Sequence, residues 1–75
     1  MNNWWSSSTK VRDHRGRWER EPVLMVLNET RMTPENQNMV IEYLCEGRGV
    51  SQFRVSRQQV YARVKKIVNI LVNKD

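Results

Sequence analysis

The residues with the most specific chemistry lie close together, between positions 56 and 62. The chain there reads Ser-Arg-Gln-Gln-Val-Tyr-Ala. Arginine can pair with the O6 and N7 atoms of guanine, and glutamine with the N6 and N7 atoms of adenine, while an alanine methyl can touch the methyl group of thymine. We therefore expect base-edge contacts from one set of side chains: Ser56, Arg57, Gln58, Gln59, Tyr61 and Ala62.

Cations flank this stretch on both sides. A lysine or arginine that rests on a phosphate releases a condensed counterion, and such contacts position a protein on DNA without reading its sequence. We expect the phosphate contacts to come from Arg48, Arg54, Arg63, Lys65 and Lys66.

Charge is segregated along the chain, whose net charge is +5. Residues 1–17 carry four basic side chains and one acidic side chain. Residues 18–47 carry two basic and six acidic side chains, and residues 48–75 carry seven basic and one acidic. A protein that faces a polyanion has a reason for this separation. The alternative is a charged surface that only keeps the protein hydrated.

The element that must carry the proposed readers is a helix over residues 56–72, capped by Ser56. At about 100° per residue, its core stripe comprises Val60, Val64, Ile67, Val68 and Leu71, and its opposite side collects Gln58, Gln59, Ala62, Lys65, Lys66 and Asn69. An ordinary amphipathic helix has the same pattern. A helix lying on anionic lipid is less consistent with two glutamines and an asparagine on the exposed side.

Two further helices are expected before it. Thr33-Pro34-Glu35 is a start signal, because threonine caps and proline suits the first helical position. That helix should end at Gly47 and bury Val40 and Leu44, with Tyr43 at the border of its apolar face. The apolar run within residues 19–29 is too short to separate helix from strand by period, and helix is favoured because no second strand exists to pair with it.

The expected fold is all-α. It is a small helix-turn-helix DNA-binding domain of three to four helices over residues 18–75, with a linker at residues 47–55 that holds at most one or two helical turns. Residues 1–17 are predicted to be a flexible basic arm. For the tryptophans, folding back of Trp4, Trp5 or Trp18 over an edge of the core is favoured over contact with a partner.

Several classes of function are disfavoured. A single cysteine, Cys45, and a single histidine, His14, predict neither a disulfide nor a Cys/His zinc site. We expect no cofactor, no metal, no small-molecule substrate and no enzymatic activity, because no carboxylate pair shares a face with a base. The chain shows no membrane span and no signal-peptide pattern, and a bacterial cytoplasmic location is expected.

Residues 55–67, Val-Ser-Arg-Gln-Gln-Val-Tyr-Ala-Arg-Val-Lys-Lys-Ile, resemble the recognition helix of KorA/TrfB-type plasmid repressors. Residues 22–47 are similar in pattern to PapB-type fimbrial regulators, including the ending Tyr-Leu-Cys-Glu-Gly. The resemblance implies an all-helical, usually dimeric repressor of plasmid or mobile-element genes that binds operator DNA. It assigns base reading to Arg57. At the position where such repressors have a further glutamine for DNA contact, this chain has Ala62. Gln58 or Gln59 would then make that contact.

The same resemblance requires a first helix of the helix-turn-helix within or before the linker. The segment between Gly47 and Ser56 is about five residues shorter than in those families. The first helix of the helix-turn-helix must therefore be abbreviated, or must borrow the end of the preceding helix.

The predicted function is transcriptional regulation by a homodimer on a palindromic DNA operator. Ile70 and Val72 lie off the core stripe and widen the apolar surface toward the C-terminus, which favours a dimer. The alternative is a small adaptor or antitoxin-like module that uses its C-terminal helix against another protein.

Overall fold

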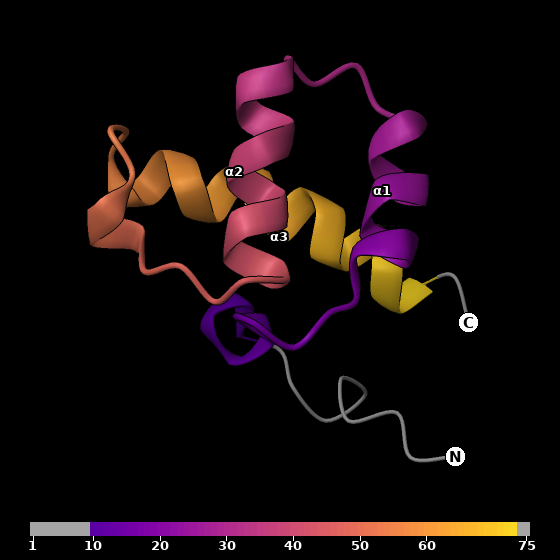
Figure 1. Ribbon diagram of the computed structural model, residues 1–75, viewed down its shortest axis with the longest axis horizontal. Coiled ribbons are helices and arrows are strands. Elements are labelled where there is room, and N and C mark those ends of the chain that lie inside the picture. The colour runs from indigo at the N-terminus through magenta and orange to yellow at the C-terminus, as the bar shows by residue number, and fades with distance from the viewer. Residues whose placement is uncertain (1–9, 74–75) are drawn as a thin grey trace.

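The computed structural model describes residues 10–73. Along the chain lie a short 3-10 helix η2 (Val11–His14), helix α1 (Arg20–Asn28), helix α2 (Pro34–Leu44), a second 3-10 helix η3 (Val50–Gln52) and helix α3 (Arg57–Asn73). The described part contains no strand, which confirms the all-α prediction. In Figure 1, α1 and α2 stand side by side and α3 crosses behind both of them.

Helix α1 is the element for which a strand was the alternative. It follows the extended residue Glu19, and Glu21 in its first turn complements the positive end of the helix dipole. Val23, Val26 and Leu27 are buried at the three- and four-residue spacing of one helix face. The helical interpretation is confirmed.

Helix α2 begins as its start signal predicts. The backbone N–H of Asn36 donates to the Thr33 hydroxyl at 3.3 Å, and Pro34 takes the first helical position. The regular helix ends at Leu44, before the expected stop at Gly47. The placement of Tyr43 at the border of the apolar face is wrong, because its side chain is only 1% exposed. Ile41, which the predicted stripe leaves out, is also buried.

Helix α3 is the longest of the helices that enclose the core. The five predicted stripe residues are all buried, and they pack against the inner faces of α1 and α2. The exposed side also agrees with prediction, since the six residues named for it are all exposed. Among the described residues, no helix is long and apolar enough to cross a membrane.

The domain begins earlier than the expected boundary at residue 18. Residues 11–14, which the sequence assigns to the arm, form η2, and His14 is 1% exposed. The Nδ1 atom of His14 accepts a hydrogen bond from Nε1 of Trp18 at 3.1 Å, and Trp18 packs against the core as the favoured interpretation of the tryptophans expects. Trp4 and Trp5 lie outside the described residues.

The segment after η2 is fixed to the C-terminal end of α2 by backbone hydrogen bonds. The N–H of Gly16 donates to the Tyr43 carbonyl and the N–H of Trp18 to the Leu44 carbonyl, both at 3.0 Å. Carbonyls at a helix end lack partners within the helix, so these bonds satisfy groups that would otherwise need water. Gly16 and Gly47 both have positive φ, and a Cβ on Gly16 would lie 3.1 Å from the Gly47 Cα.

This contact predicts unequal effects for two matched substitutions. Gly16→Ala adds a steric conflict with backbone to the strain of a left-handed residue, so we expect a loss of about 2–4 kcal/mol in unfolding free energy. Gly47→Ala meets its nearest atom at 3.6 Å, an ordinary contact, and should lose only about 1 kcal/mol. Urea denaturation of the two variants measures the difference. Equal losses would mean that the two glycines are not packed against each other.

Candidate nucleic-acid interface

The connection from α2 to α3 decides how α3 is presented. Residues 45–56 separate the two helices, whereas a helix-turn-helix joins its helices by three or four residues. Within the connection, η3 forms one short turn and residues 53–56 lead from it into α3. The only helical element between α2 and α3 is this single 3-10 turn, so the regular first helix of a helix-turn-helix does not lie directly before α3. Val50 and Phe53 both pack partly against the core and hold this turn in place.

The start of α3 is set by Ser56. Its hydroxyl accepts a hydrogen bond from the backbone N–H of Gln59 at 3.3 Å, which is the bond of a helix N-cap. This predicted base reader therefore has a structural role. The side chains that follow it, Arg57, Gln58 and Gln59, are exposed.

The exposed surface of α3 divides into three stripes at about 100° per residue. Gln58, Ala62 and Asn69 form the central stripe, opposite the core. One flank contains Arg57 and Tyr61, with Lys65 at its border about 20° from Gln58, and the other contains Gln59 and Arg63, with Lys66 at its border about 40° from Ala62. Arg63 is half-buried, and its Nη1 donates to the Gln59 carbonyl at 3.4 Å. Helix α3 contains no carboxylate, so every charged side chain on the two flanks is basic.

One predicted phosphate ligand is engaged elsewhere. The Nη1 atom of Arg48 forms an ion pair with Oε2 of Glu42 at 2.9 Å, and its Nη2 atom donates to the Gln52 carbonyl. Its guanidinium also lies 5.2 Å from the centre of the Phe53 ring. Arg48 therefore ties the connection to α2. Arg54, by contrast, is exposed.

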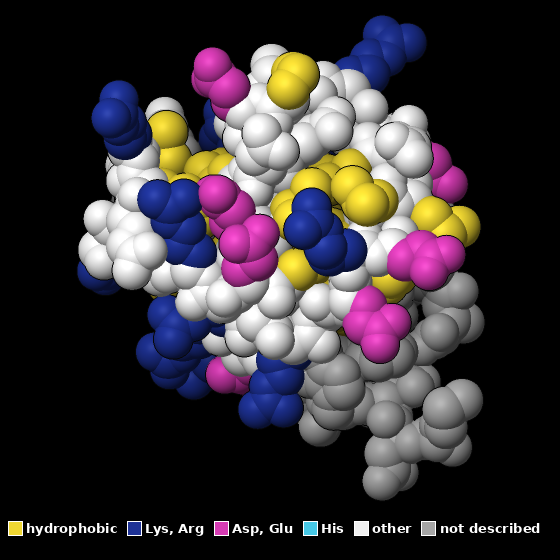
Figure 2. Space-filling view, in the orientation of Figure 1, with side chains coloured by type: hydrophobic (Ala, Val, Ile, Leu, Met, Phe, Trp, Pro, Cys, Tyr) yellow, Lys and Arg dark blue, Asp and Glu magenta, His cyan; other side chains and the backbone are white. Residues whose placement is uncertain are grey.

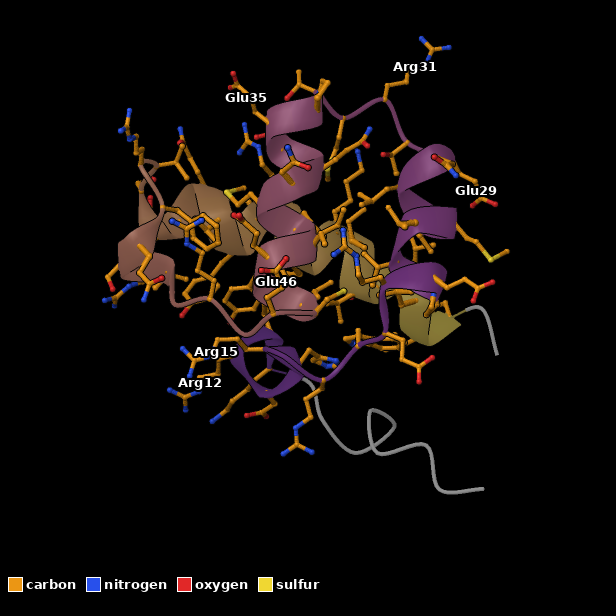
Figure 3. The ribbon with its side chains drawn as sticks, viewed as in Figure 1. Arg12, Arg15, Glu29, Arg31, Glu35 and Glu46 are labelled. Atoms are coloured by element: carbon orange, nitrogen blue, oxygen red, sulfur yellow. The ribbon has the colours of Figure 1, made fainter. Side chains whose placement is uncertain are left out.

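The fold adds three cations that the sequence-based prediction left out of the site: Lys10, Arg12 and Arg15. A hollow of about 510 Å³ lies between η2 and the start of α3, and we call it the basic hollow. Its lining residues are Lys10, Val11, Arg12, Arg57, Tyr61 and Lys65. A smaller hollow of about 330 Å³ shares Arg12 and Tyr61 with it, and its other lining residues are Asp13, Arg15, Tyr43 and Val50. Figure 3 shows Arg12 and Arg15 together, pointing outward from η2.

The distribution of charge over the surface follows this arrangement. Figure 2 shows carboxylates over the face formed by α1 and α2, while several lysine and arginine side chains gather around η2 at the lower left. Within residues 10–73, no group of three or more histidine, cysteine, aspartate or glutamate side chains is placed to hold a metal ion.

Two tyrosines support the hollow from inside. The rings of Tyr43 and Tyr61 meet edge to face, with centroids 6.3 Å apart. Burial, followed by the neighbouring Tyr61, raises the pKa of Tyr43 to about 12, although Arg15 and Arg12 act in the opposite direction. Tyr61 is half-buried against this partner, so it is better placed to shape the hollow than to reach a base edge.

The raised pKa predicts how stability changes at high pH. Below pH 10, Tyr43 is protonated in both the folded and the unfolded protein, so its contribution to the free energy of unfolding does not change with pH. Between about pH 10 and 12 only the unfolded chain releases this proton, and stability should fall by up to about 2–3 kcal/mol. Tyr43→Phe should remove that part of the loss. Urea denaturation at pH 9 and pH 11.5 measures it, and equal losses in the two proteins would contradict the assignment.

Comparisons with known protein families, with curated proteins and with solved structures found no match to this chain.

Proposed function

We propose that this protein binds double-stranded DNA with the N-terminal half of α3 and the basic hollow beside it, and regulates transcription in a sequence-specific way. The observation that carries the proposal is the order of the stripes on α3. Hydrogen-bonding and small side chains occupy the centre, and cations occupy both flanks. A helix that enters the major groove needs this order, because base edges lie at the groove floor and phosphates along its two walls.

The dimensions suit this mode of binding. The major groove is about 12 Å wide and admits one α-helix. The residues of a recognition helix that reach base edges lie near its N-terminus, and the exposed Arg57, Gln58 and Ala62 lie there in α3. We assign base reading to Gln58 and Ala62, and phosphate contact to Arg57, because Arg57 lines the basic hollow.

The two flanks then meet the two phosphate backbones. On one side, Arg57 and Lys65 are joined by the cations of η2, so that flank is broader than the sequence-based prediction suggests. On the other side lie Arg63 and Lys66. In this proposal Ser56, Tyr61 and Arg48 support the surface without reading bases.

We further propose that the protein acts as a homodimeric repressor on a palindromic operator, in the bacterial cytoplasm. Ile70 and Val72, on which the sequence-based dimer rests, pack partly against the core of their own chain. Less apolar surface is therefore left at the C-terminus for any partner, which also weakens the case for an adaptor or antitoxin-like module. The apolar surface that supports a dimer is instead on α1, where the large side chains of Leu24 and Met25 stay exposed.

Selection of bound sequences from random duplex DNA tests the proposal. We expect one enriched motif, repeated in inverted orientation for a dimer. Gln58→Ala should relax base preference at one position of each half-site, by about 1–3 kcal/mol. The control is Asn38→Ala, an exposed amide on α2, which should leave the motif unchanged. Absence of any enriched sequence with the wild-type protein would overturn sequence-specific binding.

A further inference from the structure

The basic hollow gathers positive charge at a surface depression that is largely open to solvent. Four of its lining residues are cations, Lys10, Arg12, Arg57 and Lys65, and no carboxylate is found among the described lining residues. Its volume of about 510 Å³ falls in the range of about 300–1,000 Å³ that is usual for small-molecule sites. One DNA strand passes a surface as an extended row of phosphates, one per 3.4 Å of helix axis. A compact ligand with adjacent phosphates can bring more negative charge into one hollow.

The side-chain types indicate the chemistry of such a ligand. The guanidinium groups of Arg12 and Arg57 can each grip two phosphate oxygens, while the ammonium groups of Lys10 and Lys65 act as point charges. Arg12 and Arg57 come from different elements, so a ligand between them would bridge η2 and α3.

The hollow also has an apolar wall, formed by Val11 and Tyr61. Both side chains are half-buried and held by the core, so this wall is in place before any ligand arrives. Aromatic rings favour contact with a nucleobase, whose flat face can stack on them. The combination of cations with an aromatic wall fits a phosphate chain attached to a nucleoside.

We infer that the basic hollow binds a free nucleoside polyphosphate. Binding rests only on the hollow itself. A regulatory consequence rests on the proposed function, because Arg57 and Lys65 also belong to the flank of α3 that meets DNA. Ligand and DNA would then exclude each other, and a ligand at ten times its Kd would weaken DNA binding by about tenfold.

Isothermal titration of the full chain at physiological salt tests the inference, with ATP, inorganic triphosphate and AMP as probes. We expect ATP and triphosphate to bind at least about tenfold more tightly than AMP, because AMP lacks adjacent phosphates. Tyr61→Leu should weaken ATP by several-fold and leave triphosphate unchanged. Circular dichroism checks that each variant is folded.

Two neighbouring lysines provide the matched control. Lys65 and Lys66 are both exposed on α3 and carry the same charge, but only Lys65 lines the hollow. Lys65→Gln should weaken ATP binding by about fivefold or more, which corresponds to the loss of one charge-assisted contact. Lys66→Gln should change it by less than about twofold. Equal effects of the two substitutions, or AMP binding as tightly as ATP, would overturn the inference and leave only general attraction to anions.

Measurements of duplex DNA binding and ATP binding on the same protein distinguish this inference from the proposed function. If duplex DNA binds and ATP does not, the nucleotide site is wrong and DNA binding stands. If ATP binds at the hollow and no duplex sequence is preferred, the nucleotide site stands and the proposed regulator is wrong. If both bind and ATP does not displace DNA, the regulatory consequence is wrong.

Discussion

Replacing Arg12 and Arg57 together by glutamine should lower the affinity for duplex DNA by about a hundredfold, or about tenfold for each lost phosphate contact. The dependence on salt should change as well. Each contact contributes about 0.9 to the slope of log affinity against log salt, so the slope should flatten by nearly two. Fluorescence anisotropy of a labelled duplex between 50 and 200 mM salt measures both quantities.

A second pair of arginines supplies the control. Arg20 and Arg31 are exposed and lie outside the basic hollow, Arg20 at the start of α1 and Arg31 in the loop that follows it. Figure 3 shows Arg31 pointing away from the molecule at the end opposite Arg12. Arg20→Gln with Arg31→Gln removes the same net charge and should weaken binding by less than about threefold. If both double variants lose affinity equally, total charge and not the hollow determines binding.

Ile67→Ala should destabilise the domain by about 2–5 kcal/mol. Ile67 is 0% exposed at the middle of α3 and belongs to the core shared by the three α-helices. A domain of 75 residues has a total stability of only about 4–11 kcal/mol, so this single cavity removes a large part of it. Thermal unfolding followed by circular dichroism should show a fall in Tm of about 8 °C or more, because each kcal/mol lowers Tm by roughly 4–8 °C.

The control for the core lies two residues away on the same helix. Asn69 is exposed, and Asn69→Ala should change stability by less than about 0.5 kcal/mol. If Ile67→Ala proved as mild as Asn69→Ala, the core described for α3 would be wrong.

The helices could be predicted because their signals are local. Thr33 and Ser56 cap helices through bonds to residues three positions on, and Pro34 marks a first turn by its own geometry. The stripe from Val60 to Leu71 follows from the period of a helix with one buried side. These features depend on neighbours in the chain, so a single sequence contains them.

The part of the site contributed by η2 could not be predicted in the same way. Its position depends on bonds between Gly16 and Tyr43, which are distant in sequence. The basic residues around Val11 and His14 suggested an arm, although Val11 and His14 have the three-residue spacing of one 3-10 helix face. That spacing was the available signal. The burial of Tyr43 has the same origin, because Tyr61 of α3 covers it from outside its own helix.

Two polar residues that were predicted to contact DNA also have roles within the fold. Ser56 was expected both to cap α3 and to read bases, and its oxygen does cap α3. Arg48 was expected to hold phosphate, but it pairs with Glu42 across a turn whose shape the sequence did not define. Competition between local structural roles and ligand contacts is decided by geometry, which residue type alone does not supply.

An NMR titration of the labelled protein with a duplex from the selection experiment maps the DNA-binding surface residue by residue. We predict that chemical-shift changes concentrate in the first half of α3, including the side-chain amides of Gln58 and Gln59, and in residues 10–15. The signals of Leu24 and Met25 on α1 should not shift. The titration should reach its end point at one half-site per chain. Chemical-shift changes confined to α1 and α2, or no changes when the duplex is in excess, would contradict the proposed DNA-binding surface.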